Sequence, residues 1–404
     1  MTHCDMPTVA PGARDAVRGL AVNSQPAIDP HAATLEHTTS EQMTLERWRE
    51  KYHRWLTGAA LPLWAGKGLD QKRGGFHEAL TPIGEPADLP RRARVQGRQS
   101  FVFALAGRLG WGGPWRQVAG EGLQWLERHH LRDDGLHATL VSPDGAVLDG
   151  TAMTYDQSFP LLAAAALQEL GLGPGEDHAL GLLANLERLR RHGKGFVEAD
   201  GRFLSNPQMH LFEAALAWVA AGGRAIWTEL AHDLADLALN HLIDPDDGVI
   251  GEFYDAQWRP ARGDDLVTEP GHQFEWSWLL GRWARLSGDR RAHRAAITLF
   301  EAGLRGVDPA RNVAIDETDP VGRPRRMTAR LWPQTERLKA AHLLQREAET
   351  CAAAAGLWPY LDHCRIGLWH DTLDVDGNFK KELAPASSLY HVIGAVAALQ
   401  GHWC

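Results

Sequence analysis

The chain repeats one unit about every 60 residues, and this period constrains its fold more than any other feature. Each unit has a short hairpin segment punctuated by Gly and Asp, followed by about two amphipathic helices. A fixed period of this length is typical of one supersecondary unit that is stacked repeatedly. The hairpin segments begin near Gly74, Gly135, Gly195, Gly248, Asn312 and Gly367, at intervals of 61, 60, 53, 64 and 55 residues.

Apolar residues within each unit follow the spacing of a helix face. Leu230, Leu234 and Leu237, for example, fall at i, i+4 and i+7. The pattern predicts helices over approximately 44–64, 94–109, 115–130, 156–170, 176–192, 208–221, 225–242, 270–287, 290–306, 332–346, 351–364 and 386–403.

Six helical hairpins that close on themselves form an (α/α)6 barrel, an all-α fold with short β-hairpin loops at one end. A linear solenoid fits the same period, but solenoids have nearly identical repeats and polar caps. These units have in common only the Gly and Asp residues of their hairpin segments. We therefore predict a single barrel that forms one catalytic domain over residues 43–404.

Residues 1–42 differ from the rest of the chain, because they show no sustained helical period and contain neither Trp nor Phe. We expect them to form a disordered N-terminal extension. The stretch from Met1 to Asn23 lacks the charged start and apolar segment of a signal peptide, which favours a cytoplasmic protein. The prolines that interrupt this region are Pro7, Pro11, Pro26 and Pro30.

The composition excludes several classes of function. The net charge is −9 and no Lys/Arg run exceeds two residues, which argues against nucleic-acid and anionic-membrane partners. No stretch approaches the roughly 20 apolar residues of a bilayer span. The 16 Trp residues suit stacking on apolar faces, those of sugars included. Neither a zinc nor a redox site is indicated, because no Cys-x-x-Cys spacing occurs among Cys4, Cys351, Cys364 and Cys404.

Two segments that enter helices carry the same His-x-x-Glu pattern. One runs from Asn206 through His210 to Glu213, and the other follows a Pro-Gly turn with His272 and Glu275. A spacing of three residues places each His and Glu on one face of the first turn. A single pair is usually structural, but two pairs in equivalent units indicate chemistry.

A metal site is one interpretation of these clusters, but the pattern does not favour it. Helical di-metal sites typically use Glu-x-x-His with additional glutamates, and no His-Glu-x-x-His motif occurs. Histidines without neighbouring cysteine ligands are suited to general acid–base catalysis, since His titrates near neutral pH. We therefore expect no metal and no cofactor, with catalysis by His210, His272 and His391, the last on the final helix.

Further residues at helix starts suit a polyhydroxylated ligand. Arg94 and Arg98 lie four residues apart on one helix face, and Arg98 is suited to polarise a carbonyl or stabilise an enediolate. Each residue alone is compatible with a salt bridge or a core aromatic. Together, at the same end of successive hairpins, they predict a polar pocket at the barrel mouth. The other members of this set are Tyr155, Trp332, Glu336 and Trp369.

The segments NPQMHLFEA, EPGHQFEWSWLL, RLWPQTERLKA, QGRQ and APASSLYHVIGA resemble the N-acylglucosamine 2-epimerase superfamily, from about residue 44 to the end. That group includes cellobiose and mannose 2-epimerases and the mannose and sulfoquinovose aldose–ketose isomerases. The resemblance implies an (α/α)6 barrel. It assigns the proton transfers to His272 and His391. It also implies that His210 supports ring opening and substrate binding, and that Arg98 binds the substrate oxygens near the reacting carbons. The substrate-binding positions that it implies are Tyr155, Asn206, Glu213, Glu275, Trp332, Glu336 and Trp369.

The resemblance implies a monosaccharide isomerase that interconverts D-mannose and D-fructose through a cis-enediol(ate), and Trp276 after Glu275 favours this isomerase branch. It leaves a homodimer open. One alternative is 2-epimerisation of mannose or of an N-acyl hexosamine. Another is isomerisation of mannose 6-phosphate, with Arg91-Arg92 and Arg323–Arg326 as candidate phosphate contacts. A glycoside hydrolase or a sugar-binding protein without turnover would leave the paired histidines without a role.

Overall fold

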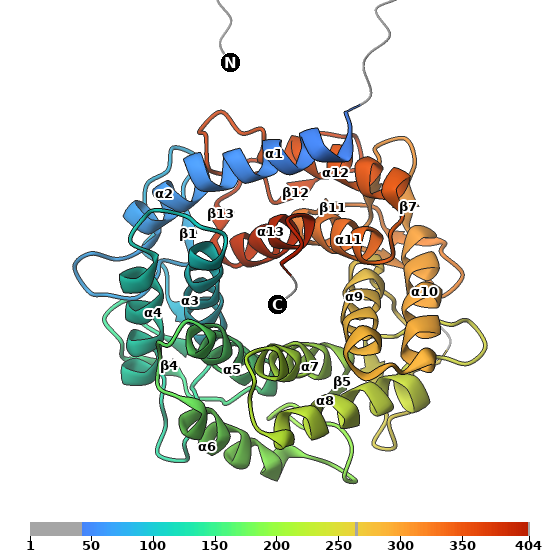
Figure 1. Ribbon diagram of the computed structural model, residues 1–404, viewed down its shortest axis with the longest axis horizontal. Helices are drawn as coiled ribbons and strands as arrows, with labels where there is room; N and C mark the ends of the chain where they lie inside the picture. The colour runs from blue at the N-terminus through green and yellow to red at the C-terminus, as the bar shows by residue number, and fades with distance from the viewer. Residues whose placement is uncertain (1–42, 263–265, 403–404) are drawn as a thin grey trace, which may run out of the picture. The chain divides into compact units, whose positions relative to one another are not determined.

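Six inner helices form a closed ring in the computed structural model, which describes residues 43–262 and 266–402 (Figure 1). Each inner helix contacts the next, and the last contacts the first. The extension expected over residues 1–42 lies outside the described residues. The inner helices are α3 (Ala93–Arg108), α5 (Thr154–Glu169), α7 (Ser205–Ala220), α9 (Pro270–Ser287), α11 (Leu331–Leu343) and α13 (Ala386–Leu399).

A second set of helices surrounds this ring (Figure 1). The predicted (α/α)6 barrel is therefore confirmed within the described residues, although α7 and α12 begin three to four residues before their predicted starts. The first outer helix contains π-helical turns and continues to Gly68. The outer helices are α1 (Leu45–Trp55) with α2 (Leu61–Leu63), α4 (Trp115–His129), α6 (Glu176–Leu186), α8 (Ala225–Leu237), α10 (Arg290–Leu304) and α12 (Glu347–Leu361).

Burial distinguishes the two rings. In α13, 12 of 14 residues are buried, since this helix packs on all sides. In α10 only 6 of 15 residues are buried, which is the amphipathic pattern of a helix with one face in water. Within the described residues, no helix is long and apolar enough to cross a membrane.

Short antiparallel strands join neighbouring units where the inner helices begin. β2 directly precedes α3, β5 precedes α7, β11 precedes α11 and β13 precedes α13. The paired strands are β1 (Ala79–Leu80) with β13 (Ala384–Pro385), β2 (Arg91–Arg92) with β3 (Leu140–Val141), β3 with β4 (Val147–Asp149), β5 (Phe203–Leu204) with β6 (Phe253–Tyr254), β7 (Val307–Asp308) with β8 (Val313–Ala314), β9 (Glu317–Thr318) with β10 (Pro324–Arg326), and β11 (Ala329–Arg330) with β12 (Thr372–Leu373).

Five units fasten their hairpin to the inner helix with the same device, which we call the glutamine clamp. The Oε1 atom of a buried Gln accepts a hydrogen bond from the backbone N–H of one hairpin residue. The Nε2 atom of the same Gln donates a hydrogen bond to the backbone carbonyl of that residue. The donor–acceptor distances are 2.6–2.9 Å. The side chain thus satisfies both backbone groups, as a neighbouring strand would. The clamped pairs are Gln96 with Phe76, Gln157 with His137, Gln208 with Phe196, Gln273 with Ile250, and Gln334 with Ala314.

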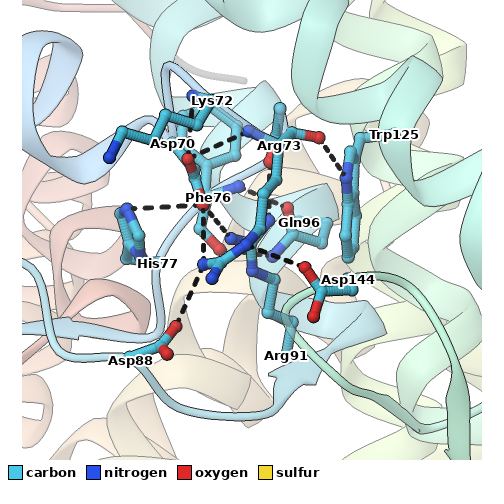
Figure 2. Close-up of polar contacts among 11 residues, drawn as sticks. Asp70, Lys72, Arg73, Phe76, His77, Asp88, Arg91, Gln96, Trp125 and Asp144 are labelled. Carbon is cyan, nitrogen blue, oxygen red and sulfur yellow. Dashed lines mark hydrogen bonds and ion pairs between the residues drawn. The ribbon is translucent and has the colours of Figure 1, made fainter.

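Asp70 fixes the first hairpin from its outer side (Figure 2). Its carboxylate accepts the backbone N–H groups of Lys72 and Arg73, at 2.9 and 3.1 Å, and pairs with Arg91. Burial raises the pKa of Asp70, but these hydrogen bonds and the charge of Arg91 lower it to about 2. Arg91 is 1% exposed and lies 4.8 Å from the ring of Trp125. It therefore serves the fold and is unsuited to the phosphate contact considered from the sequence.

Candidate active site

The first turns of the six inner helices surround one polar cavity of about 360 Å³. Helix N-termini carry partial positive charge, so all six helices favour negative charge that develops in this cavity. The size lies within the range of small-molecule sites. The structure brings to its wall most of the residues expected from the sequence: Arg98, Tyr155, Asn206, His210, His272, Glu275, Trp332 and His391.

His272, in the first turn of α9, is held by carboxylates. Its Nδ1 lies 2.9 Å from both Oε1 and Oε2 of Glu252, which precedes β6. Burial lowers the pKa of His272, but the charges of Glu252 and Glu269 and the hydrogen bond outweigh this and raise it to about 9. His272 is therefore protonated at neutral pH. Because Glu252 occupies Nδ1, Nε2 is the nitrogen left to face a ligand.

His391, in the second turn of α13, has the opposite surroundings. Its Nδ1 lies 2.9 Å from Oε1 of Glu336, and Oε2 of Glu336 lies 2.6 Å from the ammonium of Lys339. Burial lowers the pKa of His391 well below 6.5, and the positive charges of Arg98 and Lys339 lower it further. His391 is therefore neutral, with its proton toward Glu336 and its lone pair on Nε2.

Trp332 brings the two histidines to one wall of the cavity. Its ring centroid lies 5.0 Å from that of His272 and 5.7 Å from that of His391. This contact requires a glycine in the preceding helix, because a Cβ at Gly271 would lie 2.5 Å from the Trp332 ring. The Pro-Gly-His segment thus combines a close helix approach with an imidazole that lines the cavity.

His210 lines the cavity and contacts a buried group behind it. Its Nδ1 is 3.3 Å from Glu213, which also accepts a hydrogen bond from the Tyr390 hydroxyl. Burial lowers the pKa of His210 to about 4. Burial raises the pKa of Glu213, but the hydrogen bond and charge of His210 bring it down to about 2. Burial and the charge of Glu336 raise the pKa of nearby Glu275 well above its ordinary value.

Arg98 points its guanidinium into the cavity from α3. Its Nη2 donates to the Tyr155 hydroxyl at 2.8 Å, and the guanidinium packs over the rings of Phe159 and Tyr390 at 4.2 and 4.8 Å. Gly97 permits this placement, since a Cβ there would lie 2.7 Å from the backbone of Phe159. A planar donor held in this way is suited to bind vicinal oxygens.

Three residues expected in the pocket lie elsewhere. Glu213 and Glu336 are placed behind the wall, where they contact His210 and His391. Trp369 is 2% exposed and stacks on Trp64 in the core, with ring centroids 4.7 Å apart. The structure does not bring Trp369 to the cavity, because its ring completes this stack.

Sequence reasoning missed several residues that contact the catalytic histidines or the cavity. Glu252 lies on a hairpin 20 residues from His272, so no helical spacing links them. The adjacent wall contains Glu269 paired with Arg330 at 2.8 Å, and the Ser388 hydroxyl donates to Asp371 at 2.6 Å. Glu269, Arg330 and Ser388 lie at the starts of inner helices, as the predicted residues do, and this position was the available signal. Glu252 and Asp371 lie on hairpins and lack it.

Histidine and carboxylate groups of the described residues also form three sets whose potential ligand atoms lie within 4.8 Å of one another. In each set the His Nδ1 faces a carboxylate at 2.9–3.3 Å, an arrangement that orients an imidazole for proton transfer as well as it holds an ion. The sets are His210 with Glu213 and Glu275, His272 with Glu252 and Glu269, and His391 with Glu275 and Glu336.

Comparisons with known proteins agree with this geometry. The sequence model of the N-acylglucosamine 2-epimerase family matches residues 74–395. A mannose-6-phosphate isomerase of Rhizobium meliloti is 41% identical over 378 residues, which are 86% of this chain and 95% of that protein.

Two solved structures share the barrel. A D-mannose isomerase superposes with a TM-score of 0.78 at 22% identity, over 88% of this chain and 97% of the other. A cellobiose 2-epimerase from Bacillus thermoamylovorans superposes with a TM-score of 0.78 at 17% identity, over 88% of this chain and all of the other. At these identities the likeness establishes the fold.

Proposed function

Since the chain belongs to the N-acylglucosamine 2-epimerase family and is a sugar isomerase, we propose that it interconverts D-mannose and D-fructose by metal-independent proton transfer. One observation carries this proposal: His272 and His391 share a wall of the cavity, but their pKa values are shifted in opposite directions. Such a pair supplies an acid and a base at the same pH.

His272 is the acid that opens the sugar ring. A proton from its Nε2 goes to the ring oxygen as the bond between that oxygen and C1 breaks, and the C1 hydroxyl gives its proton to water. Ring opening produces the free aldehyde, whose carbonyl acidifies the C2 hydrogen. The contact of Nδ1 with Glu252 stabilises the protonated ring before the transfer.

His391 is the base that acts on the open chain. Its Nε2 takes the C2 proton, the electron pair forms the C1–C2 double bond, and the aldehyde oxygen becomes an enediolate. Arg98 and the inner helix N-termini stabilise this charge. The C2 hydroxyl then gives its proton to the oxygen on C1, and return of the His391 proton to C1 as the C2 carbonyl forms gives the ketose. Return to the opposite face of C2 would give the epimer.

Mannose 6-phosphate is a second candidate substrate, favoured by the name of the 41% identical relative. Arg92, Arg94 and Arg330 line the cavity. However, each already pairs with a carboxylate: Arg92 with Glu78 at 2.6 Å, Arg94 with Asp156 at 2.8 Å, and Arg330 with Asp316 at 2.9 Å. Arginines with their charge already compensated favour the neutral sugar.

Proton NMR in D2O tests the proposal. Purified protein treated with chelator is mixed with mannose in D2O. We expect fructose signals to grow, and we expect the sugar to take up deuterium because His391 exchanges its proton with the solvent. Glucose with deuterium at C2 would show 2-epimerisation instead, and a strict metal requirement would contradict proton transfer without metal. Mannose 6-phosphate turned over with a much higher kcat/KM than mannose would make the phosphate the substrate. In that case Arg94→Met would reduce turnover of the phosphate far more than that of mannose.

A further inference from the structure

Lys339 is a buried cation in the barrel interior that the proposed reaction does not use directly. Its side chain is 4% exposed, and its ammonium lies 2.6 Å from Oε2 of the fully buried Glu336. It also lies 5.4 Å from the centre of the Trp278 ring. Burying a lysine is unfavourable unless its charge is compensated. The pair therefore indicates a specific role.

Lys339 does not touch the substrate cavity. It lines a separate small cavity toward the other end of the barrel, together with Glu213 and Tyr390. Between Lys339 and the sugar stand Glu336 and then His391, whose Nδ1 is 2.9 Å from Oε1 of Glu336. The contacts run from Lys339 through Glu336 to Nδ1 of His391, while Nε2 of the same ring is the proposed base.

We propose that Lys339 is a positioning residue, whose ammonium keeps Glu336 ionised and so holds the His391 proton on Nδ1 and its lone pair on Nε2. The inference rests on the proposed role of His391 as the base. Burial raises the pKa of Glu336 above its ordinary value, and the charge and hydrogen bond of Lys339 act against this rise. Without the cation the pKa of Glu336 would therefore rise further, which favours its protonated form. A neutral carboxylic acid would no longer fix the tautomer of His391.

The charges around this line give the direction of the effect. Carboxyl groups come from Glu213 on α7 and Glu275 on α9, and other titratable groups are His210 on α7, His272 on α9 and Tyr390 on α13. The other cation that faces His391 is Arg98 on α3. Removal of the Lys339 charge favours protonation of both Glu336 and His391, so both pKa values rise. The active form needs both groups deprotonated.

The test is Lys339→Met, assayed by solvent deuterium exchange at C2 with whichever sugar the wild-type protein turns over. We expect kcat to fall by about 10- to 100-fold, below the roughly 10²–10⁴ of a general base itself. KM should change less than about threefold, because no contact with the sugar is lost. The acid limb of the kcat profile should move up by about one pH unit or more.

Two variants separate this role from a structural one. Lys339→Arg keeps the charge and should leave the acid limb in place. Arg337→Met is a matched control on the same helix: Arg337 is also 4% exposed and pairs with Glu349 at 2.6 Å, but on the outer side. It should reduce thermal stability without moving the limb.

A double variant keeps the test decisive if Lys339→Met does not fold. Glu336→Gln with Lys339→Met removes both charges together, and its exchange rate should equal that of Glu336→Gln alone within about threefold. A further tenfold loss, or an unshifted limb in Lys339→Met, would overturn the inference. Absence of exchange in the wild-type protein with every sugar would instead reject the proposed function.

Discussion

The surroundings of His272 and of His391 differ in charge and in depth. Around His272 lie the carboxylates Glu252 and Glu269, and Arg330, which pairs with Glu269, is one-third exposed. Around His391 the fully buried Glu336 is compensated by Lys339. One imidazole therefore gains a proton and the other loses it, although both contact the same tryptophan.

This difference shows that a single residue type becomes an acid or a base through its neighbours. Carboxylates in excess stabilise an imidazolium, whereas burial beside cations stabilises neutral imidazole. The following predictions test the contrast, beginning with the largest change in turnover.

The histidines themselves should separate the two steps. His272→Asn and His391→Asn should each reduce kcat by about 10²–10⁴-fold, because each removes a proton-transfer group. Ring opening interconverts mannose anomers, so His391→Asn should still accelerate mutarotation, measured by polarimetry, whereas His272→Asn should not. Equal mutarotation in both variants would contradict the division of roles.

A smaller change is expected when Glu252 is neutralised. The folded pKa of His272, about 9, lies above its ordinary value of 6.5, so turnover should fall as pH rises through about 9. The ion pair of protonated His272 with Glu252 contributes fully to the stability of the folded protein below pH 6.5. This contribution is lost as pH rises toward about 9. Glu252→Gln removes a negative charge beside the ring and should move the basic limb to lower pH by about one unit.

The matched measurement is the acid limb of the same pH–rate profile for Glu252→Gln. It should stay in place, because that limb belongs to the surroundings of His391. If both limbs moved together, the two histidines would titrate as one coupled system.

The smallest effect on turnover is expected outside both surroundings. Asp70→Asn breaks a buried ion pair with Arg91 and should lower the free energy of unfolding by about 3 kcal/mol. Denaturant unfolding measures this, and both limbs of the pH profile should remain unchanged. Because the folded pKa of Asp70 lies below its ordinary value of 3.8, its contribution is present above that pH and is lost toward pH 2.

The sequence predicted the ring of helices and the three histidines that line the cavity, because both follow local rules. The 60-residue period specifies six equivalent units, and a polar residue at the start of each inner helix points to the mouth. Glu252 was missed because its contact with His272 depends on how a hairpin folds back. Lys339, three residues after Glu336, has the spacing of an ordinary surface ion pair, and only the closed barrel buries it.

The glutamine clamps separate the part of this chain that must stay constant from the part that is free to change. Four of the five clamps bind only the backbone of the hairpin residue, so they accept any residue there except proline, which has no N–H. In the fifth, Gln157 Oε1 also lies 3.2 Å from the His137 ring. Each clamp fastens a hairpin to the inner helix of its own unit. New loop sequences can therefore arise at one unit at a time while the helices and the proton-transfer groups keep their positions. This modularity offers a physical route by which one barrel diversifies among sugars.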